Sequence, residues 1–204
     1  MIGLVGGVGS GKSCLARLLH EKHPIQIVEG DPAGHQVLTE PAVKESLRTA
    51  FGDGVFTPGG DVDRRQMSRL VFGSSPEQTA ARKQLENIVH PRITDILTRQ
   101  VELARTQPGI EAVILDAALM LETGWRDLCD ALVFIEVPLE QRLGRVQATR
   151  GWSREQLQLR EDSQYPLERK RREAEYVVDN SGDVAVALSQ LEEIYARITG
   201  PAPR

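Results

Sequence analysis

The chain has 204 residues, of which 40% are hydrophobic and 26% are charged, and its formal net charge is -4. Its length suits one α/β domain with an insertion. The acidic balance argues against nucleic acid or an anionic membrane as the main partner. With no apolar run of membrane length and no signal peptide, a cytoplasmic protein with reduced cysteines is expected.

The N-terminal stretch is an apolar segment, residues 2–5, followed by the loop Gly6-Gly-Val-Gly-Ser-Gly-Lys-Ser13. The loop fits the pattern G-x-x-x-x-G-K-[ST], and helical periodicity predicts a helix over residues 12–22 after it. Glycines let successive N–H groups converge on phosphate oxygens. Lys12 would contact the β and γ phosphates of a nucleotide, and Ser13 would ligate Mg²⁺. The predicted nucleotide contacts are Gly9, Ser10, Gly11, Lys12, Ser13 and Cys14.

Residues 25–28 predict a second strand, which runs into Glu29-Gly-Asp31. Ligands of doubly wound sheets lie at the carboxyl ends of the strands, so Asp31 is expected to face the same crevice as the loop. It is the leading candidate for a general base, and also for a magnesium ligand. Because Pro32 follows it, Asp31 also fits a helix N-cap, a role compatible with catalysis.

From residue 36 to about 105 the strand signal disappears, and helical periodicity with a loop at 52–60 predicts a helical insertion. The spacing of Ser75 and Gln78 is that of a capping box, which predicts a helix running toward Val89. His90-Pro91 is expected to end this helix and open the next. Taken locally, His90 suits a cap or a packed position, and Arg64 suits solvated surface.

Residues 112–116 form an unbroken apolar run that ends in an acid, as expected of a strand buried on both faces of a parallel sheet. Asp116 stands where a P-loop protein often keeps a second magnesium residue. The sequence leaves open whether Asp31 or Asp116 lies nearer the metal. Glu122 could share the crevice or begin a helix.

A fourth strand is predicted at 131–137 and a helix after Pro138. That helix carries Arg142, Arg145 and Arg150, which form either a solvated basic face or part of a lid over the transferring phosphoryl group. The capping-box spacing from Ser153 predicts a charged helix ending near residue 173. A fifth strand at 176–178 and an amphipathic helix from 184 to 198 complete the chain, before a tail at 200–204 that is expected to be unstructured.

Taken together, these landmarks resemble the dephospho-CoA kinase family across nearly the whole chain. The segments that carry the resemblance are Gly6–Ser13, Asp31, Gly60-Asp-Val-Asp-Arg64, Leu85-Glu-Asn-Ile-Val-His-Pro91, Leu119-Met-Leu-Glu-Thr-Gly124, Gln141-Arg-Leu-Gly-Arg145 with Arg150, Ser163-Gln164 and Tyr176-Val-Val-Asp-Asn-Ser-Gly182.

The resemblance implies a P-loop kinase fold: a five-stranded parallel sheet with helices on both faces, a helical substrate insertion and a helical lid. The nucleotide-binding core would comprise residues 1–35, 111–138 and 174–200, the CoA-binding insertion 36–110 and the lid 139–173. The implied reaction is ATP-dependent phosphorylation of the ribose 3′-hydroxyl of dephospho-CoA, with Mg²⁺, by a monomer or small homo-oligomer. The implied catalytic residues are Lys12, Asp31, Arg142, Arg145 and Arg150; Asp31, Arg64, His90 and Glu122 would bind the substrate.

The chain departs from the family pattern at a few positions. Cys14 replaces a threonine, Ala118 a proline, and Glu175 the aspartate of an Ala-Asp pair. Glu29 replaces the first aspartate of Asp-x-Asp, which shifts more of the base role onto Asp31.

Three other functions fit parts of the sequence. Another small P-loop kinase, acting on a nucleoside or nucleoside monophosphate, would share the motif order. A GTPase switch is suggested by Asn180-Ser-Gly-Asp183, which imitates a guanine-reading motif but lacks its lysine. A non-catalytic ATP-binding module is disfavoured by the intact Lys12, Ser13 and Asp31.

Overall fold

The computed structural model describes residues 1–73 and 75–200, so most of the expected unstructured tail lies outside the described residues. The chain forms two compact units. Unit 1 consists of Met1–Glu29 and Gln100–Arg204, and unit 2 consists of Gly30–Arg99.

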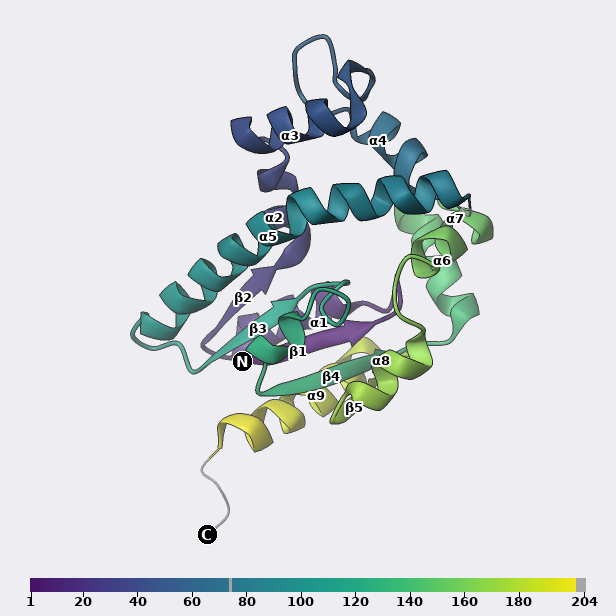
Figure 1. Cartoon of the computed structure of the whole chain (residues 1–204). Coiled ribbons are helices and arrows are strands. Elements are labelled where there is room, and N and C mark those ends of the chain that lie inside the picture. Colours follow the sequence, from purple (N-terminus) through teal and green to yellow (C-terminus); the bar gives the residue numbers. More distant parts are fainter. Residues whose placement is uncertain (74, 201–204) are drawn as a thin grey trace. The chain divides into compact units, whose positions relative to one another are not determined.

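Unit 1 is built on a five-stranded sheet in which all neighbouring strands are parallel (Figure 1). The strand order is β2-β3-β1-β4-β5, so β1 is central and the order reverses beside it. This confirms the predicted fold class. The strands are β1 (Ile2–Gly6), β2 (Ile25–Glu29), β3 (Ala112–Asp116), β4 (Ala131–Glu136) and β5 (Tyr176–Asp179).

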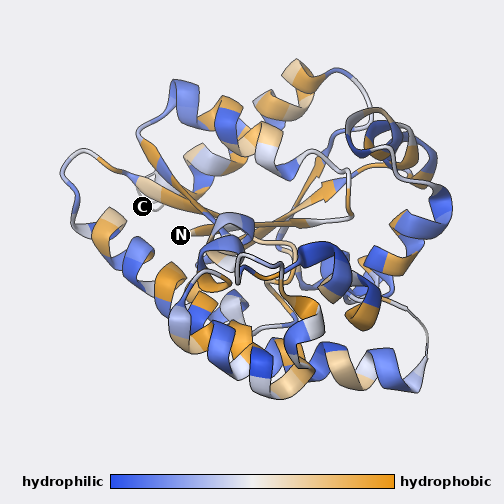
Figure 2. Ribbon diagram, turned by 90° about the horizontal axis from the view of Figure 1, so that it is seen from above, coloured by the Kyte–Doolittle hydropathy of each residue, from blue (hydrophilic) through white to orange (hydrophobic). Residues whose placement is uncertain are grey.

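The apolar runs of the central strands are buried on both faces of the sheet, as a parallel sheet requires. Figure 2 shows these strands largely in the colour of hydrophobic residues. On one face, Ile2 and Leu4 pack against Leu15 of α1 (Lys12–Lys22) and Leu191 of α9 (Val184–Thr199). On the other face, Gly3 leaves room for the side chains of the loop after β3, because a Cβ there would lie 2.5 Å from the Met120 sulfur.

The remaining helices of unit 1 follow β4 or precede β5. They are α6 (Leu139–Arg150), α7 (Arg154–Glu161) and α8 (Leu167–Glu173), with a short 3₁₀ turn, η2 (Trp125–Leu128), before β4. The capping box at Ser153 and Gln156 is confirmed. The single helix predicted to follow it is wrong, because α7 ends at Glu161 and α8 begins only after Pro166. A proline disfavours helical geometry in the residue before it, which explains the break.

Unit 2 is helical. It contains α2 (Gly30–Val37), α3 (Pro41–Phe51), the 3₁₀ turn η1 (Asp53–Val55), α4 (Arg64–Val71) and most of α5 (Pro76–Thr106), whose last turns belong to unit 1. The capping box at the start of α5 is present, because Gln78 N–H donates to the Ser75 hydroxyl and Ser75 N–H donates to the Gln78 side chain.

The predicted break at His90-Pro91 is wrong. Helix α5 continues through Pro91 to Thr106. A proline inside a helix removes one backbone hydrogen bond and costs about 3 kcal/mol. The apolar stripe on the far side of the proline opposes that cost, since Ile93, Leu97 and Val101 are all buried. Burial of this stripe therefore outweighs the local preference of the proline.

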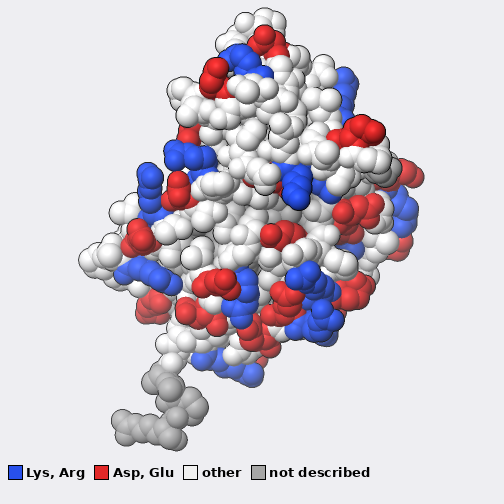
Figure 3. All heavy atoms as spheres, viewed as in Figure 1, with Lys and Arg blue, Asp and Glu red and all other residues white. Residues whose placement is uncertain are grey.

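No helix in the described part of the chain is both long and apolar enough to cross a membrane. On the face shown in Figure 3, basic and acidic side chains are interspersed. This mixture agrees with the small net charge of -4.

The two cysteines lie in different environments, which leads to a prediction. Cys14 is exposed, whereas Cys129 is buried. Burial raises the pKa of the Cys129 thiol to about 11, so the reactive thiolate form is scarce at pH 8. We expect a chromogenic disulfide reagent to titrate one thiol per folded chain and two after denaturation. Cys14→Ser should remove the fast-reacting thiol, and two fast-reacting thiols in the folded protein would contradict the burial of Cys129.

Candidate active site

The phosphate loop leaves the carboxyl end of β1, the central strand, where the strand order reverses. Ligands of open α/β sheets bind at such points, outside the carboxyl ends of the strands. Helix α1 begins at Lys12, directly after Gly11. Its first backbone N–H groups and its positive dipole end therefore lie within the motif, as the sequence predicted.

Lys12 lies across its own loop. Its Nζ donates hydrogen bonds to the carbonyl oxygens of Gly6, at 3.1 Å, and Gly7, at 3.2 Å. The loop also turns back on itself, because Ser10 N–H donates to the same Gly7 oxygen at 3.1 Å. The cationic end of Lys12 is thus held over the concavity formed by the loop, where it can meet phosphate oxygens.

Two elements distant in sequence pack tightly on the loop. A Cβ on Gly9 would lie 2.9 Å from the Arg142 carbonyl oxygen, and a Cβ on Gly11 would lie 2.6 Å from Asn180 Nδ2. Both glycines also have positive φ angles, of 79° and 89°. Any other residue would be strained there and would collide with its neighbour. The motif glycines are therefore required by α6 and by the loop after β5 as well as by phosphate.

The three predicted arginines of α6 have different surroundings. Arg142 is buried, and its guanidinium forms an ion pair with Glu161 of α7 and donates to the carbonyl oxygens of Val8 and Val137. Arg145 donates to the carbonyl oxygens of Asn180, at 2.8 Å, and Ser10, at 3.4 Å. Among the described residues, no carboxylate lies within ion-pair distance of Arg145. Its positive charge beside the phosphate loop is therefore not neutralised by an acidic partner.

Arg150, the third arginine, is exposed at the end of α6. Its guanidinium carbon lies 4.8 Å from the centre of the Trp152 ring, and that of Arg160 lies 5.3 Å from the same ring. Burial and the positive charge of Arg150 lower the pKa of Arg160 from its ordinary value. Two guanidinium groups share one aromatic side chain, so an anion bound between them would relieve their repulsion.

The carboxyl edge of the sheet carries two acids on adjacent strands. Asp116 ends β3 and is 8% exposed. In the strand register it is paired with Glu29 of β2 and with Leu4 of β1. Parallel neighbours in register direct their side chains to the same face. Asp116 therefore lies on the strand adjacent to β1, which leads into the phosphate loop.

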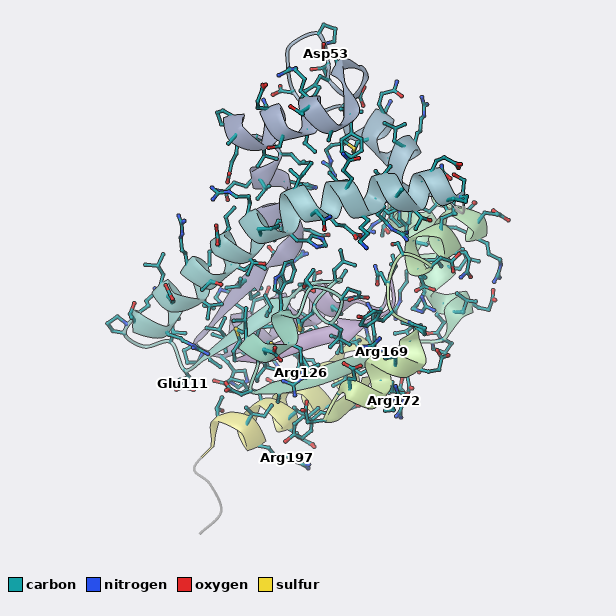
Figure 4. All side chains as sticks on the ribbon, viewed as in Figure 1. Asp53, Glu111, Arg126, Arg169, Arg172 and Arg197 are labelled. Atoms are coloured by element: carbon teal, nitrogen blue, oxygen red, sulfur yellow. The ribbon has the colours of Figure 1, made fainter. Side chains whose placement is uncertain are left out.

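Glu122 belongs to a buried polar cluster. Its Oε1 accepts the Tyr165 N–H at 2.6 Å and lies 3.0 Å from Lys170 Nζ. Lys170 is only 1% exposed, and it also donates to the Ala118 carbonyl and to Gln164 Oε1. Arg169 and Arg172 of the same helix are exposed (Figure 4). Glu122 therefore connects the loop after β3 to α8 and lies in no helix, so the alternative that it begins one is wrong.

The other predicted residues lie in unit 2. Asp31 is exposed in the first turn of α2, which begins at Gly30 and so places Asp31 inside the helix instead of at its N-cap. Arg64 is exposed as the first residue of α4, directly after Asp63, whose side chain caps that helix. His90 is partly buried within α5, and desolvation lowers its pKa. Burial therefore favours the uncharged form of His90.

Sequence reasoning missed three residues that the structure places beside the loop or its arginines. They are Asn180, whose Nδ2 donates to the Ser10 carbonyl at 2.8 Å; Glu161, the partner of Arg142; and Arg160. Asn180 lies two residues after the predicted fifth strand, so its place at the carboxyl edge could have been inferred. No local pattern marks Glu161 or Arg160, which are two charged residues in a charged helix.

A pocket of about 450 Å³ opens beside the phosphate loop. It lies at the carboxyl ends of β4 and β5 and is closed on one side by α8. Its lining includes Gly7, Glu136, Arg142, Leu167, Arg171 and Ser181. The surface next to the loop is thus concave, as a ligand-binding edge of an α/β sheet is expected to be.

Comparison with known proteins identifies the family. The family model described as dephospho-CoA kinase matches residues 1–185. The dephospho-CoA kinase of Geobacter sulfurreducens is 34% identical over 198 residues, covering 97% of this chain and 98% of that protein. The Thermus thermophilus enzyme of that name is 36% identical over 203 residues, covering 99% and 93%.

Solved structures agree with this result. The crystal structure of TT1252 from Thermus thermophilus has a TM-score of 0.77 and 34% identity, covering 98% of this chain and 97% of that one. Dephospho-CoA kinase from Campylobacter jejuni, with a TM-score of 0.66 and 21% identity, covers 97% and 96% and supports the fold. A shikimate kinase from Bacteroides thetaiotaomicron shares the fold at 13% identity and a TM-score of 0.54, covering 97% and 96%. With its phosphate loop, parallel sheet and full-length matches, the chain belongs to the dephospho-CoA kinase family.

Proposed function

We propose that this protein transfers the γ-phosphoryl group of ATP to the ribose 3′-hydroxyl of dephospho-CoA, giving coenzyme A and ADP, as a cytoplasmic enzyme. The observation that carries the proposal is the family match over residues 1–185, which includes an intact phosphate loop. The phosphate loop supports binding of the nucleotide, and family membership supports dephospho-CoA as the acceptor. Residues 36–110 and 139–173 are proposed as the CoA-binding insertion and the lid.

The residues present suit Mg²⁺, the ion expected to accompany ATP. The Ser13 hydroxyl in the first turn of α1 and the carboxylate of Asp116 are hard oxygen ligands of the kind this ion takes, with phosphates and water completing its shell. Asp31 is the alternative carboxylate. When bound, the ion neutralises charge on the β and γ phosphates.

The protein side of the mechanism is mainly positioning. Lys12 and the N–H groups of the loop hold the phosphates, while Asp31 accepts or orients the proton of the 3′-hydroxyl. Arg145 and Arg150 neutralise the transferring group, and closure of the site excludes water that would otherwise hydrolyse ATP. Arg142 contributes through the loop, because its own charge is neutralised by Glu161.

On the substrate side we propose Arg64, His90 and Glu122. Arg64 is exposed and cationic, which suits a phosphate of dephospho-CoA. His90, whose uncharged form is favoured by burial, would act as a hydrogen-bonding group. Glu122 keeps one oxygen, Oε2, that is buried and has no hydrogen-bond partner among the described residues. A substrate contact with that oxygen therefore requires the residues around it to move.

The first experiment is a substrate test. We expect ADP release with Mg-ATP and dephospho-CoA, and a product phosphorylated at the 3′ position. Nucleosides and nucleoside monophosphates should give no comparable turnover. Turnover with one of those acceptors alone would replace the proposal by another small P-loop kinase, and a preference for GTP without any acceptor would favour a switch protein.

Lys12→Ala and Asp31→Asn should separate nucleotide binding from proton transfer. Lys12→Ala removes a cation aimed at the phosphates, so both ATP affinity and activity should fall, with kcat/KM reduced at least about a hundredfold. Asp31→Asn should reduce kcat while the dissociation constant for ATP stays within about twofold. Normal turnover by Asp31→Asn would show that Asp31 is not the base.

Arg150 and Arg154 provide a matched pair in the proposed lid. Both are exposed, but Arg154 forms a surface ion pair with Glu140, whereas Arg150 lies beside Trp152 and Arg160. Arg150→Ala should lower kcat at least about tenfold, because lid arginines neutralise the transferring phosphoryl group. Arg154→Ala should stay within about twofold of the wild type, since surface ion pairs contribute little. Equal kcat values for the two variants would remove Arg150 from the mechanism.

A further inference from the structure

Val8, at the tip of the phosphate loop, is held by α6 and α7 at three points. Its carbonyl oxygen accepts a hydrogen bond from Arg142 at 3.3 Å, and its N–H donates to Glu161 Oε1 at 3.2 Å. Its side chain packs on the small apolar cluster of Leu143, Val146 and Leu157. Arg142 and Glu161 also pair with each other, so they form a clamp around one residue of the loop.

The contact with Glu161 fixes the peptide plane between Gly7 and Val8. In a trans peptide the N–H and C=O groups point in opposite directions. With the Val8 N–H directed to Glu161, the Gly7 carbonyl must point the other way. That oxygen accepts from Lys12 Nζ at 3.2 Å and from Ser10 N–H at 3.1 Å. Glu161 thereby orients the acceptor that holds Lys12.

The contact with Arg142 fixes the next peptide plane, between Val8 and Gly9. Residues Gly7 to Ser10 form a β-turn closed by the hydrogen bond from Ser10 N–H to the Gly7 oxygen. Gly9, at its third position, has a φ of 79°, which fits a type II turn. Rotation of the middle peptide would convert this turn to type I. Arg142 holds the Val8 carbonyl on one side, so the Gly9 N–H is directed to the opposite side.

Burial makes the clamp strong. The side chains of Arg142 and Glu161 are 4% and 15% exposed, so their interaction is little screened by water. Arg142 Nε also donates to the Val137 carbonyl at 3.1 Å. Both charged side chains therefore contact the loop directly, at Val8.

We propose that Glu161 is a positioning residue for ATP: with Arg142 it sets the two peptide planes around Val8, and through them Lys12 and the Gly9 N–H, before the nucleotide arrives. Preformed donors avoid an ordering cost on binding. Loss of the clamp should therefore weaken ATP binding more than it slows phosphoryl transfer. This inference rests on the proposed kinase function for its kinetic readout.

The test compares Glu161→Ala with Asp162→Ala, which removes the same charge from the neighbouring, exposed position. For Glu161→Ala we expect the dissociation constant for Mg-ATP, measured by calorimetric titration, to rise at least about tenfold. The KM for ATP should rise equally, while kcat at saturating ATP and the KM for dephospho-CoA stay within about twofold. Asp162→Ala should match the wild type. Glu161→Gln, which keeps an acceptor for the Val8 N–H, should restore part of the affinity.

Glu161→Ala leaves Arg142 buried without its partner and could unfold the protein, so a second variant is needed. Replacing both residues by apolar ones, in Arg142→Met with Glu161→Leu, removes the clamp and the buried charge together. This double variant should remain folded and still bind Mg-ATP at least about tenfold more weakly. Wild-type affinity in a folded clamp variant would overturn the inference. The titration contains no dephospho-CoA, so it also remains decisive if the wild type proves to phosphorylate another acceptor.

Discussion

The N–H groups of the phosphate loop must point into one concavity, and most of unit 1 contributes to this constraint. Strand β4 sets the start of the loop, because a Cβ on Gly6 would lie 2.7 Å from the Ile135 carbonyl oxygen. Helix α6 leaves no room for a side chain at Gly9, and Asn180 leaves none at Gly11. A glycine-rich loop can adopt many conformations, and these contacts restrict it to one of them. The strand order brings these contacting elements to the loop, since β1 lies between β3 and β4.

Two buried ion pairs attach the charged helices to this core. Arg142 with Glu161 joins α6 and α7 at the loop, and Lys170 with Glu122 joins α8 to the segment after β3. Taking such charges out of water is costly, and only full hydrogen bonding offsets the cost. Lys170 meets this condition with three oxygen partners. These two ion pairs thus attach residues 139–173 to the core near both ends of the segment.

Much of the core could be predicted from sequence because its signals are local. An apolar run that ends at a glycine-rich loop, or at an acid, places a strand and its carboxyl end. Residues 112–116 and 12–22 were predicted with the bounds that the structure has. The errors occurred where a proline was taken as decisive or was overlooked. Helix α5 runs through Pro91, whereas the helix predicted from Ser153 to 173 breaks before Pro166. Tertiary packing decides whether a helix continues through a proline or breaks before it. A local sequence pattern does not contain information about that packing.

The candidate site likewise contains residues that could be predicted from the sequence and residues that could not. Lys12 and Ser13 follow from a motif whose geometry is fixed by the chain itself, and their positions in the loop were predictable. The role of Arg142 was not, because its pairing with Glu161 joins two helices whose sequences read only as charged surface. A cation that looks free in the sequence is neutralised in the fold, while Arg145, three residues later, keeps its charge beside the loop.

The acceptor side depends on a different kind of inference. In unit 2, Arg64 follows a helix cap, and His90 lies partly buried in a long helix. Each position has a sufficient structural explanation, so neither geometry nor composition singles it out as functional. The proposal that they bind the substrate rests on family membership, because the motifs around Arg64 and His90 are among those by which the chain resembles dephospho-CoA kinases. A phosphate loop binds the donor nucleotide through backbone geometry common to many kinases, whereas the acceptor site proposed above uses side chains of an inserted unit. Under this proposal the choice between a CoA precursor and a nucleoside depends on unit 2, and a measurement with substrates tests it directly.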